Sequence, residues 1–89
     1  MKKVAVIGAG TMGNGIAHTF AQNDFTVRLI DLSADTLKRG LETIERNLGR
    51  QLDKGQIDAD KKSQTLANIS TFTSLKEGVE GVDLVVEAA

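Results

Sequence analysis

Three glycines near the start of the chain have the spacing of a phosphate-binding turn. The segment Gly8-x-Gly10-x-x-Gly13 follows directly after a short apolar run and leads into a helical pattern. Gly8 permits a tight turn out of a strand, Gly10 lets backbone approach a pyrophosphate, and Gly13 lets the helix pack closely on the strand. The first N–H groups of that helix, at Thr11 and Met12, point toward the bound anion, and the helix dipole reinforces them. Because glycine-rich turns are common, a tight turn without a ligand is the alternative.

An acidic residue further along makes a dinucleotide the more specific prediction. Asp31 lies eighteen positions after Gly13, at the end of a second apolar run, where a carboxylate accepts hydrogen bonds from the adenosine ribose hydroxyls. Its charge would repel the 2′-phosphate of NADP, and the next residues, Leu32 and Ser33, include no arginine to bind that phosphate. The sequence therefore favours NAD over NADP. Leu32, directly after Asp31, is also predicted to bind the cofactor. The glycine loop alone does not exclude FAD, and Asp31 as a polar strand end or helix cap is the alternative.

Strand and helix patterns alternate along the chain and place these residues. Short β-branched or apolar runs predict strands over residues 3–7, 26–30, 69–72 and 82–87. Helical signals predict a helix over 11–22, a long helix from the N-cap Ser33 to a stop at Lys54-Gly55, a shorter one from Asp58 to about Ala67, and a helical turn over 74–79. This order predicts an α/β fold of the Rossmann type, with a parallel sheet in the strand order 3-2-1-4 and right-handed crossovers.

Composition excludes several other kinds of function. The 89 residues suffice for one domain, over residues 1–89, and 11 Lys and Arg against 12 Asp and Glu give a net charge of −1. This balance lacks the basic surface that nucleic-acid or membrane-surface binding needs, so neither partner is expected. Without cysteine and with one histidine, the chain has no cysteine or histidine metal cluster, and no metal site is expected. The apolar run after residue 3 is too short for a signal peptide or a membrane span, which makes the cytoplasm the expected compartment.

From Gly8 to Ala17 (GAGTMGNGIA) and at Asp31, the sequence resembles the 3-hydroxyacyl-CoA dehydrogenase family, in particular its bacterial 3-hydroxybutyryl-CoA dehydrogenases. The likeness continues through RGL at 39–41, KGQI at 54–57 and DLVVEAA at 83–89, so it covers essentially the whole chain. It implies an NAD-dependent oxidoreductase of fatty acid metabolism that interconverts 3-hydroxyacyl-CoA and 3-ketoacyl-CoA by hydride transfer. The resemblance also implies pyrophosphate over Gly10 to Met12, ribose on Asp31, the backbone at Ala88 close to the cofactor, and Lys54, Lys61 and Lys62 in a region turned toward CoA.

Members of this family continue beyond the segment that the chain resembles, with a catalytic histidine paired with a glutamate and a helical domain. The chain is therefore expected to be the NAD-binding half, to hold no catalytic residue and to bind NAD without turnover. An acyl-CoA substrate is expected only together with the C-terminal half.

His18 is not expected to take the place of the family's catalytic histidine. It lies about 200° around its predicted helix from Ile16 and so faces away from the apolar stripe of that helix. That stripe consists of Met12, Ile16 and Phe20, with Ala17 and Ala21 beside them, and it is expected to face the core. Glu87 lies at the end of a predicted strand, but no base is paired with its carboxylate, so it is not expected to be catalytic.

The predicted sheet, truncated after its fourth strand, is left partly uncovered. In the order 3-2-1-4, helices between the first three strands cover one face, and only residues 74–81 cross to the other. The run from Leu84 to Val86 makes both faces of the fourth strand apolar, and that strand is an unpaired edge. A homo-oligomer through the exposed face or the edge is therefore expected. Two further interpretations stay open: a non-catalytic NAD-binding module, and a self-assembling Rossmann module with an empty loop.

Overall fold

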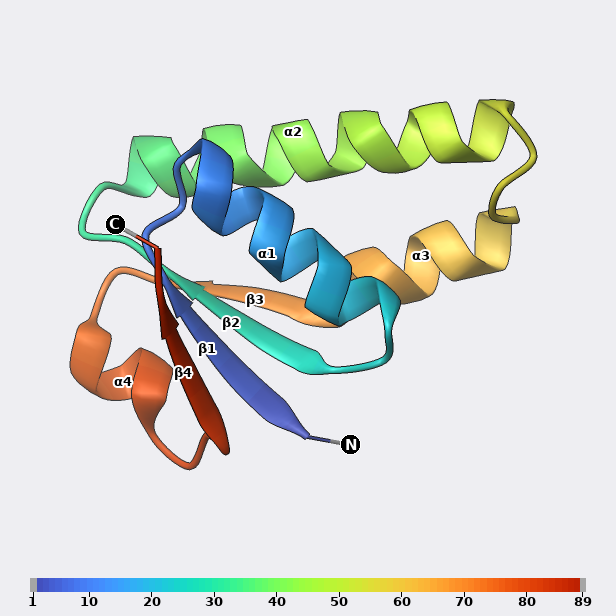
Figure 1. Ribbon diagram of the computed structural model, residues 1–89. Coiled ribbons are helices and arrows are strands. Elements are labelled where there is room, and N and C mark those ends of the chain that lie inside the picture. Colours follow the sequence, from blue (N-terminus) through green and yellow to red (C-terminus); the bar gives the residue numbers. More distant parts are fainter. Residues whose placement is uncertain (1, 89) are drawn as a thin grey trace.

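Four parallel strands form a single sheet in the computed structural model, which describes residues 2–88 (Figure 1). They are β1 (Lys3–Ile7), β2 (Thr26–Ile30), β3 (Ile69–Phe72) and β4 (Leu84–Glu87), in the spatial order β3-β2-β1-β4. This order and the parallel pairing confirm the predicted Rossmann-type sheet. The carboxyl ends of the strands consequently meet at one edge of the sheet, which is where ligands bind in open parallel sheets.

The fourth strand begins later than predicted, at Leu84 rather than at residue 82. Gly81 adopts a left-handed conformation with φ of 72°, which turns the chain before the strand. The Asp83 N–H then donates to the Lys3 carbonyl over 2.8 Å, and the Asp83 carboxylate accepts from the Lys3 N–H over 2.9 Å. These two bonds fix β4 against β1 in the register that places Glu87 opposite Ile7.

Helices α1 (Thr11–Gln22), α2 (Ala34–Asp53), α3 (Ala59–Ala67) and α4 (Leu75–Val79) connect the strands. Figure 1 shows α1, α2 and α3 on one face of the sheet and the short α4 on the other. The predicted N-caps are confirmed, because the side chains of Ser33 and Asp58 accept hydrogen bonds from the backbone N–H groups of Thr36 and Lys61. Ser74 caps α4 in the same way. Each cap satisfies a backbone donor that the helix itself leaves unpaired, which sets where the helix begins.

The core lies between the sheet and the helices α1 to α3. From β1 and β2 it receives side chains that are at most 1% exposed, namely Val4, Val6, Val27 and Leu29. From α2 it receives Ile44 and Leu48, both fully buried. Such β-branched and leucine-rich strands are typical of parallel sheets whose core face is covered by helices.

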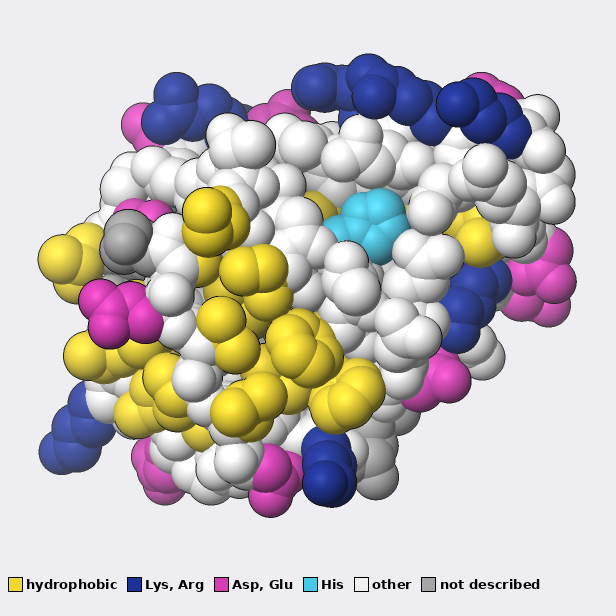
Figure 2. All heavy atoms as spheres, viewed as in Figure 1, with side chains coloured by type: hydrophobic (Ala, Val, Ile, Leu, Met, Phe, Trp, Pro, Cys, Tyr) yellow, Lys and Arg dark blue, Asp and Glu magenta, His cyan; other side chains and the backbone are white. Residues whose placement is uncertain are grey.

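The buried side of α1 agrees with the predicted stripe at its two alanines and departs from it at Met12. Ala17 and Ala21 are fully buried, whereas Met12 is 68% exposed and Ile16 and Phe20 are only partly buried. Small side chains let the helix backbone approach the strands closely, so the larger side chains lie along the flank of the helix. Figure 2 shows hydrophobic side chains gathered on this side of the molecule, over α1 and β4. The prediction of a core-facing position was therefore wrong for Met12.

Arg28 holds α4 on the opposite face of the sheet. Its guanidinium donates to the carbonyl of Glu80 over 2.6 Å and to that of Glu77 over 3.3 Å, at the end of α4. The guanidinium carbon also lies 5.5 Å from the centre of the Phe72 ring. Val85 is in register with Arg28 through β1, so it points to this same face, where it is 48% exposed. Within residues 2–88, the helical cover of this face is thus limited to α4.

Candidate dinucleotide-binding site

The turn after β1 depends on two glycines. Gly8 has a φ of 100°, a conformation that residues with a Cβ rarely adopt, and its N–H donates to the Ile30 carbonyl at the end of β2 over 2.7 Å. A Cβ on Gly13 would overlap the Gly8 carbonyl oxygen, so α1 lies against the turn at a separation that only glycine permits. Gly8 and Gly13 therefore have the structural roles expected of them, a tight turn and a close helix contact.

Gly10 is different, because no heavy atom outside Gly10 and its two chain neighbours lies within 4 Å of the position that its Cβ would take. Its φ of −67° is also one that any residue adopts. Neither packing nor backbone conformation within the chain requires glycine at this position. The open space in front of Gly10 is where the predicted pyrophosphate contact falls.

The N-terminus of α1 is left open to an anion. Among the helices of the described chain, α1 alone begins without a side-chain cap, and its first turn contains no acidic residue. The helices α2, α3 and α4 each have a hydrogen-bonded cap and an acidic residue in the first turn. Because a helix N-terminus presents unpaired N–H groups and a partial positive charge, the backbone at Thr11 and Met12 can bind phosphate oxygens.

Asp31, at the end of β2, joins the glycine turn to the start of α2. One carboxylate oxygen accepts the Ala9 N–H over 3.0 Å, and the other accepts the Ser33 N–H over 2.9 Å. The bond from Ala9 and then that from Ser33 hold the pKa of the Asp31 carboxyl below its ordinary value, so the group is ionised at neutral pH. Each oxygen can accept a further hydrogen bond, which leaves capacity for two ribose hydroxyls. The bond to Ala9 was not predicted, because sequence spacing carries no signal for it.

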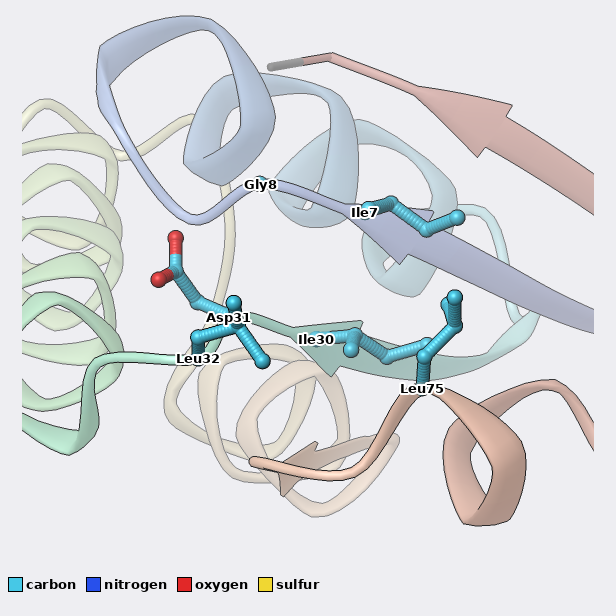
Figure 3. Close-up of a pocket in the computed structure, with 6 residues that line it drawn as sticks. All are labelled: Ile7, Gly8, Ile30, Asp31, Leu32 and Leu75. Atoms are coloured by element: carbon cyan, nitrogen blue, oxygen red, sulfur yellow. The ribbon is translucent and has the colours of Figure 1, made fainter.

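A cavity of about 310 Å³ adjoins this carboxylate and is lined by Ile7, Gly8, Ile30, Asp31, Leu32 and Leu75 (Figure 3). Figure 3 shows the Asp31 carboxylate pointing toward the turn at Gly8, while Leu75 reaches in from α4. Leu32 is 89% exposed and Leu75 is 49% exposed, so apolar surface is available for a ligand. An apolar pocket with a carboxylate at one end suits a flat base attached to a ribose. The sequence predicted Leu32 here but not Leu75, which enters the site only through the fold.

The end of β4 lies beside the glycine turn. The Ala88 N–H donates to the Ile7 carbonyl over 2.8 Å. The Ala88 Cβ is 3.6 Å from the position that a Cβ on Gly13 would take. The fold thus brings the predicted residues of the site together: Gly8, Gly10, Thr11, Met12 and Gly13 on the turn, Asp31 and Leu32 after β2, and Ala88 after β4.

The other chemically reactive side chains lie elsewhere. The Nε2 atom of His18 is 2.7 Å from the Gln22 side-chain oxygen and 3.3 Å from that of Gln51, so this imidazole packs lightly between α1 and α2. Lys61 bonds Asp24 over 3.3 Å. Within residues 2–88 there is no group of three His, Cys, Asp or Glu side chains that could hold a metal ion. No helix in that part of the chain is long and apolar enough to cross a membrane.

Known proteins resemble this chain over nearly its whole length. The family model for the NAD-binding domain of 3-hydroxyacyl-CoA dehydrogenase matches residues 3–89. A 3-hydroxybutyryl-CoA dehydrogenase of Bradyrhizobium diazoefficiens is 47% identical over the whole chain, which covers 30% of that relative. A 3-hydroxyadipyl-CoA dehydrogenase of Escherichia coli is 37% identical, and the chain covers 18% of it. The crystal structure of (S)-3-hydroxybutyryl-CoA dehydrogenase from Ralstonia eutropha superposes with a TM-score of 0.95 at 35% identity, over 100% of this chain and 31% of that one. The chain therefore spans less than a third of the length of these relatives.

Proposed function

The chain belongs to the 3-hydroxyacyl-CoA dehydrogenase family, as an NAD-binding domain, and from this premise we propose that it holds NAD for the oxidation of a 3-hydroxyacyl-CoA to the 3-ketoacyl-CoA. The observation that carries the proposal is the position of Asp31. Its carboxylate lies between the apolar cavity and the glycine turn, and it contacts both. The adenosine ribose and the pyrophosphate of a dinucleotide are adjacent groups, so they require adjacent binding elements of these two kinds.

Five of the predicted site residues would contact the cofactor directly in this proposal. Backbone N–H groups at Thr11 and Met12 would bind the pyrophosphate, and the open space at Gly10 would let it approach. The carboxylate of Asp31 would accept the ribose hydroxyls, with the adenine against Leu32 and Leu75. The bound cofactor supplies the carbon that accepts or gives the hydride.

The same carboxylate supports the choice of NAD over NADP. Its pKa is lowered, so it is negatively charged at neutral pH and would repel a phosphate on the ribose 2′-oxygen. The neighbouring side chain of Leu32 is apolar and provides no counter-charge. We expect NADPH to bind more weakly than NADH for this reason.

Oxidation of the substrate hydroxyl also needs a base, and the described residues offer no suitable one near the cofactor. The one histidine of the sequence, His18, bonds two glutamines at the contact between α1 and α2. Glu87 is exposed at the end of β4, and no His or Lys within residues 2–88 forms an ion pair with it. We infer that the acid–base pair and most of the acyl-CoA site belong to a part of the enzyme outside this chain. The chain alone should bind NAD without turnover.

A second proposal concerns self-association. On β4, Leu84 is 47% exposed and Val85 is 48% exposed, on opposite faces of an edge strand. Exposed apolar side chains on an unpaired edge favour pairing with another chain. We propose that the isolated chain forms a homo-oligomer through this strand. A sedimentation mass equal to one chain at tens of micromolar would count against it.

The main proposal is tested by titrating NADH into the purified chain and following nicotinamide fluorescence, with NADPH as the comparison. We expect saturable binding of NADH and weaker binding of NADPH. Oxidation of 3-hydroxybutyryl-CoA should stay at background in the same preparation. Equal binding of the two nucleotides would contradict the role given to Asp31. Turnover by the chain alone would contradict the placement of the base.

A further inference from the structure

A polar groove of about 220 Å³ runs between the glycine turn and α2. Its polar lining comes from Thr11 and Asn14 on α1 and from Thr36, Arg39 and Thr43 on α2, and it contains no carboxylate. Gly40 sets the width of the groove, because a Cβ there would come within 2.9 Å of the Ala9 carbonyl oxygen. The close contact at Gly40 thus brings this part of α2 against the turn that the pyrophosphate is proposed to bind.

Asn14 is an unusual polar residue in this setting. It is only 7% exposed, and its carboxamide makes no hydrogen bond with any residue in the described part of the chain. Among the described residues, no side-chain nitrogen or oxygen is both sealed from solvent and unpaired, so the polar atoms of this carboxamide still reach water. The groove is the space that Asn14 lines. The amide therefore faces the groove with its hydrogen-bonding capacity unused.

Arg39 supplies positive charge to the same groove. Its side chain is exposed and forms no ion pair with residues 2–88. Among the described residues that line either the groove or the cavity beside Asp31, Arg39 is the sole cation. The pyrophosphate of a dinucleotide carries two negative charges, whereas the α1 N-terminus offers only a partial positive charge. The guanidinium of Arg39 is the cationic group that lines this groove and can neutralise part of the negative charge that the helix N-terminus leaves unbalanced.

We propose that Arg39 and Asn14 bind the pyrophosphate of the dinucleotide from the α2 side, opposite the cavity that takes the adenosine. The proposal rests on the proposed function, since it assumes that a dinucleotide occupies the glycine turn. Arg39 contributes charge and N–H donors to phosphate oxygens, and the Asn14 side-chain NH₂ donates one further hydrogen bond. Affinity for the phosphates therefore comes from three sources: the helix N-terminus, the guanidinium and the amide.

The test compares the dissociation constants of NADH for the wild-type chain, Arg39→Gln and Lys38→Gln. The two variants remove the same charge from adjacent exposed positions of α2, but only Arg39 lines the groove. We expect Arg39→Gln to weaken NADH binding about threefold to tenfold at low salt, and less at high salt because the charge is screened. Lys38→Gln should change it less than about twofold. Adenosine, which has no phosphate, should bind the wild-type chain and Arg39→Gln equally.

A second pair of variants tests the amide. Asn14→Asp places a negative charge beside the phosphates and should weaken NADH binding more than Asn14→Ala does, while adenosine binding stays unchanged. Equal NADH affinity in wild type and Arg39→Gln would overturn the inference and leave the proposed function intact. Failure of the folded wild-type chain to bind NADH would overturn both.

Discussion

Replacing Gly10 with alanine should leave the fold intact and weaken NAD binding. The added methyl group meets no heavy atom within 4 Å beyond the two neighbouring residues of the chain, and the backbone φ of −67° suits alanine. Alanine has less backbone freedom than glycine in the unfolded chain, so this replacement alone stabilises the folded state by about 0.4–1 kcal/mol. Alanine is a poorer N-cap than glycine by a similar amount, so the net change should stay below about 0.5 kcal/mol. Thermal unfolding should shift by less than about 4 °C.

Binding should respond far more strongly than stability. The methyl group occupies the space through which the pyrophosphate approaches, and overlap of this kind costs about 1–3 kcal/mol. The dissociation constant for NADH, measured by nicotinamide fluorescence, should therefore rise by a factor of about 5 to about 150.

Gly13→Ala is the matched variant, because its methyl group would overlap the Gly8 carbonyl oxygen and force α1 away from the turn. It should lower the free energy of unfolding by about 1–3 kcal/mol. The reasoning is refuted if Gly10→Ala is as unstable as Gly13→Ala, or if it stays stable and binds NADH normally.

Three further predictions concern single side chains. Backbone N–H bonds lower the pKa of the Asp31 carboxyl below 3.8, so its ionised form stabilises the fold above that pH, and this contribution is lost as the pH falls through the lower folded-state pKa. The difference in urea midpoint between wild type and Asp31→Asn should therefore shrink below about pH 4, and a constant difference would contradict this cause. Arg28→Met keeps the side-chain stem but loses two bonds to the end of α4, and it should lower the unfolding free energy by about 1 kcal/mol in a urea titration; an unchanged midpoint would count against this anchor. Val85→Lys places a charge on the exposed edge strand β4 and should lower the sedimentation mass toward that of a monomer. An unchanged mass would contradict an interface through β4.

The features that the sequence predicted well depend on a few neighbouring residues. Ser33 and Asp58 cap helices because their own side chains bond N–H groups three positions later. The valines and isoleucines of β1 and β2 form buried strands in short runs that end at turn residues. Gly8 and Asp31 directly follow two neighbouring parallel strands, so their position at one edge of the sheet also follows from the strand order.

The features that it missed arise where distant segments meet. The exposure of Met12 follows from the close approach of α1 to the sheet, which helical periodicity alone does not reveal. The bond from Ala9 to Asp31 joins two loops across 22 positions. The groove between Asn14 and Arg39 exists because α2 packs against the turn at Gly40. Each depends on how closely two elements pack, and the spacing of residues within one element carries no record of that separation.

The most direct measurement is a map of backbone amide chemical shifts of the isotope-labelled chain as NAD is added. We predict the largest changes at Gly10 to Gly13, at Asp31 and Leu32, and at Ala88. The chemical shifts of the amides in α3 and around His18 should remain unchanged. Changes concentrated on α3, or changes spread evenly over the chain, would contradict the assignment of the dinucleotide to the glycine turn.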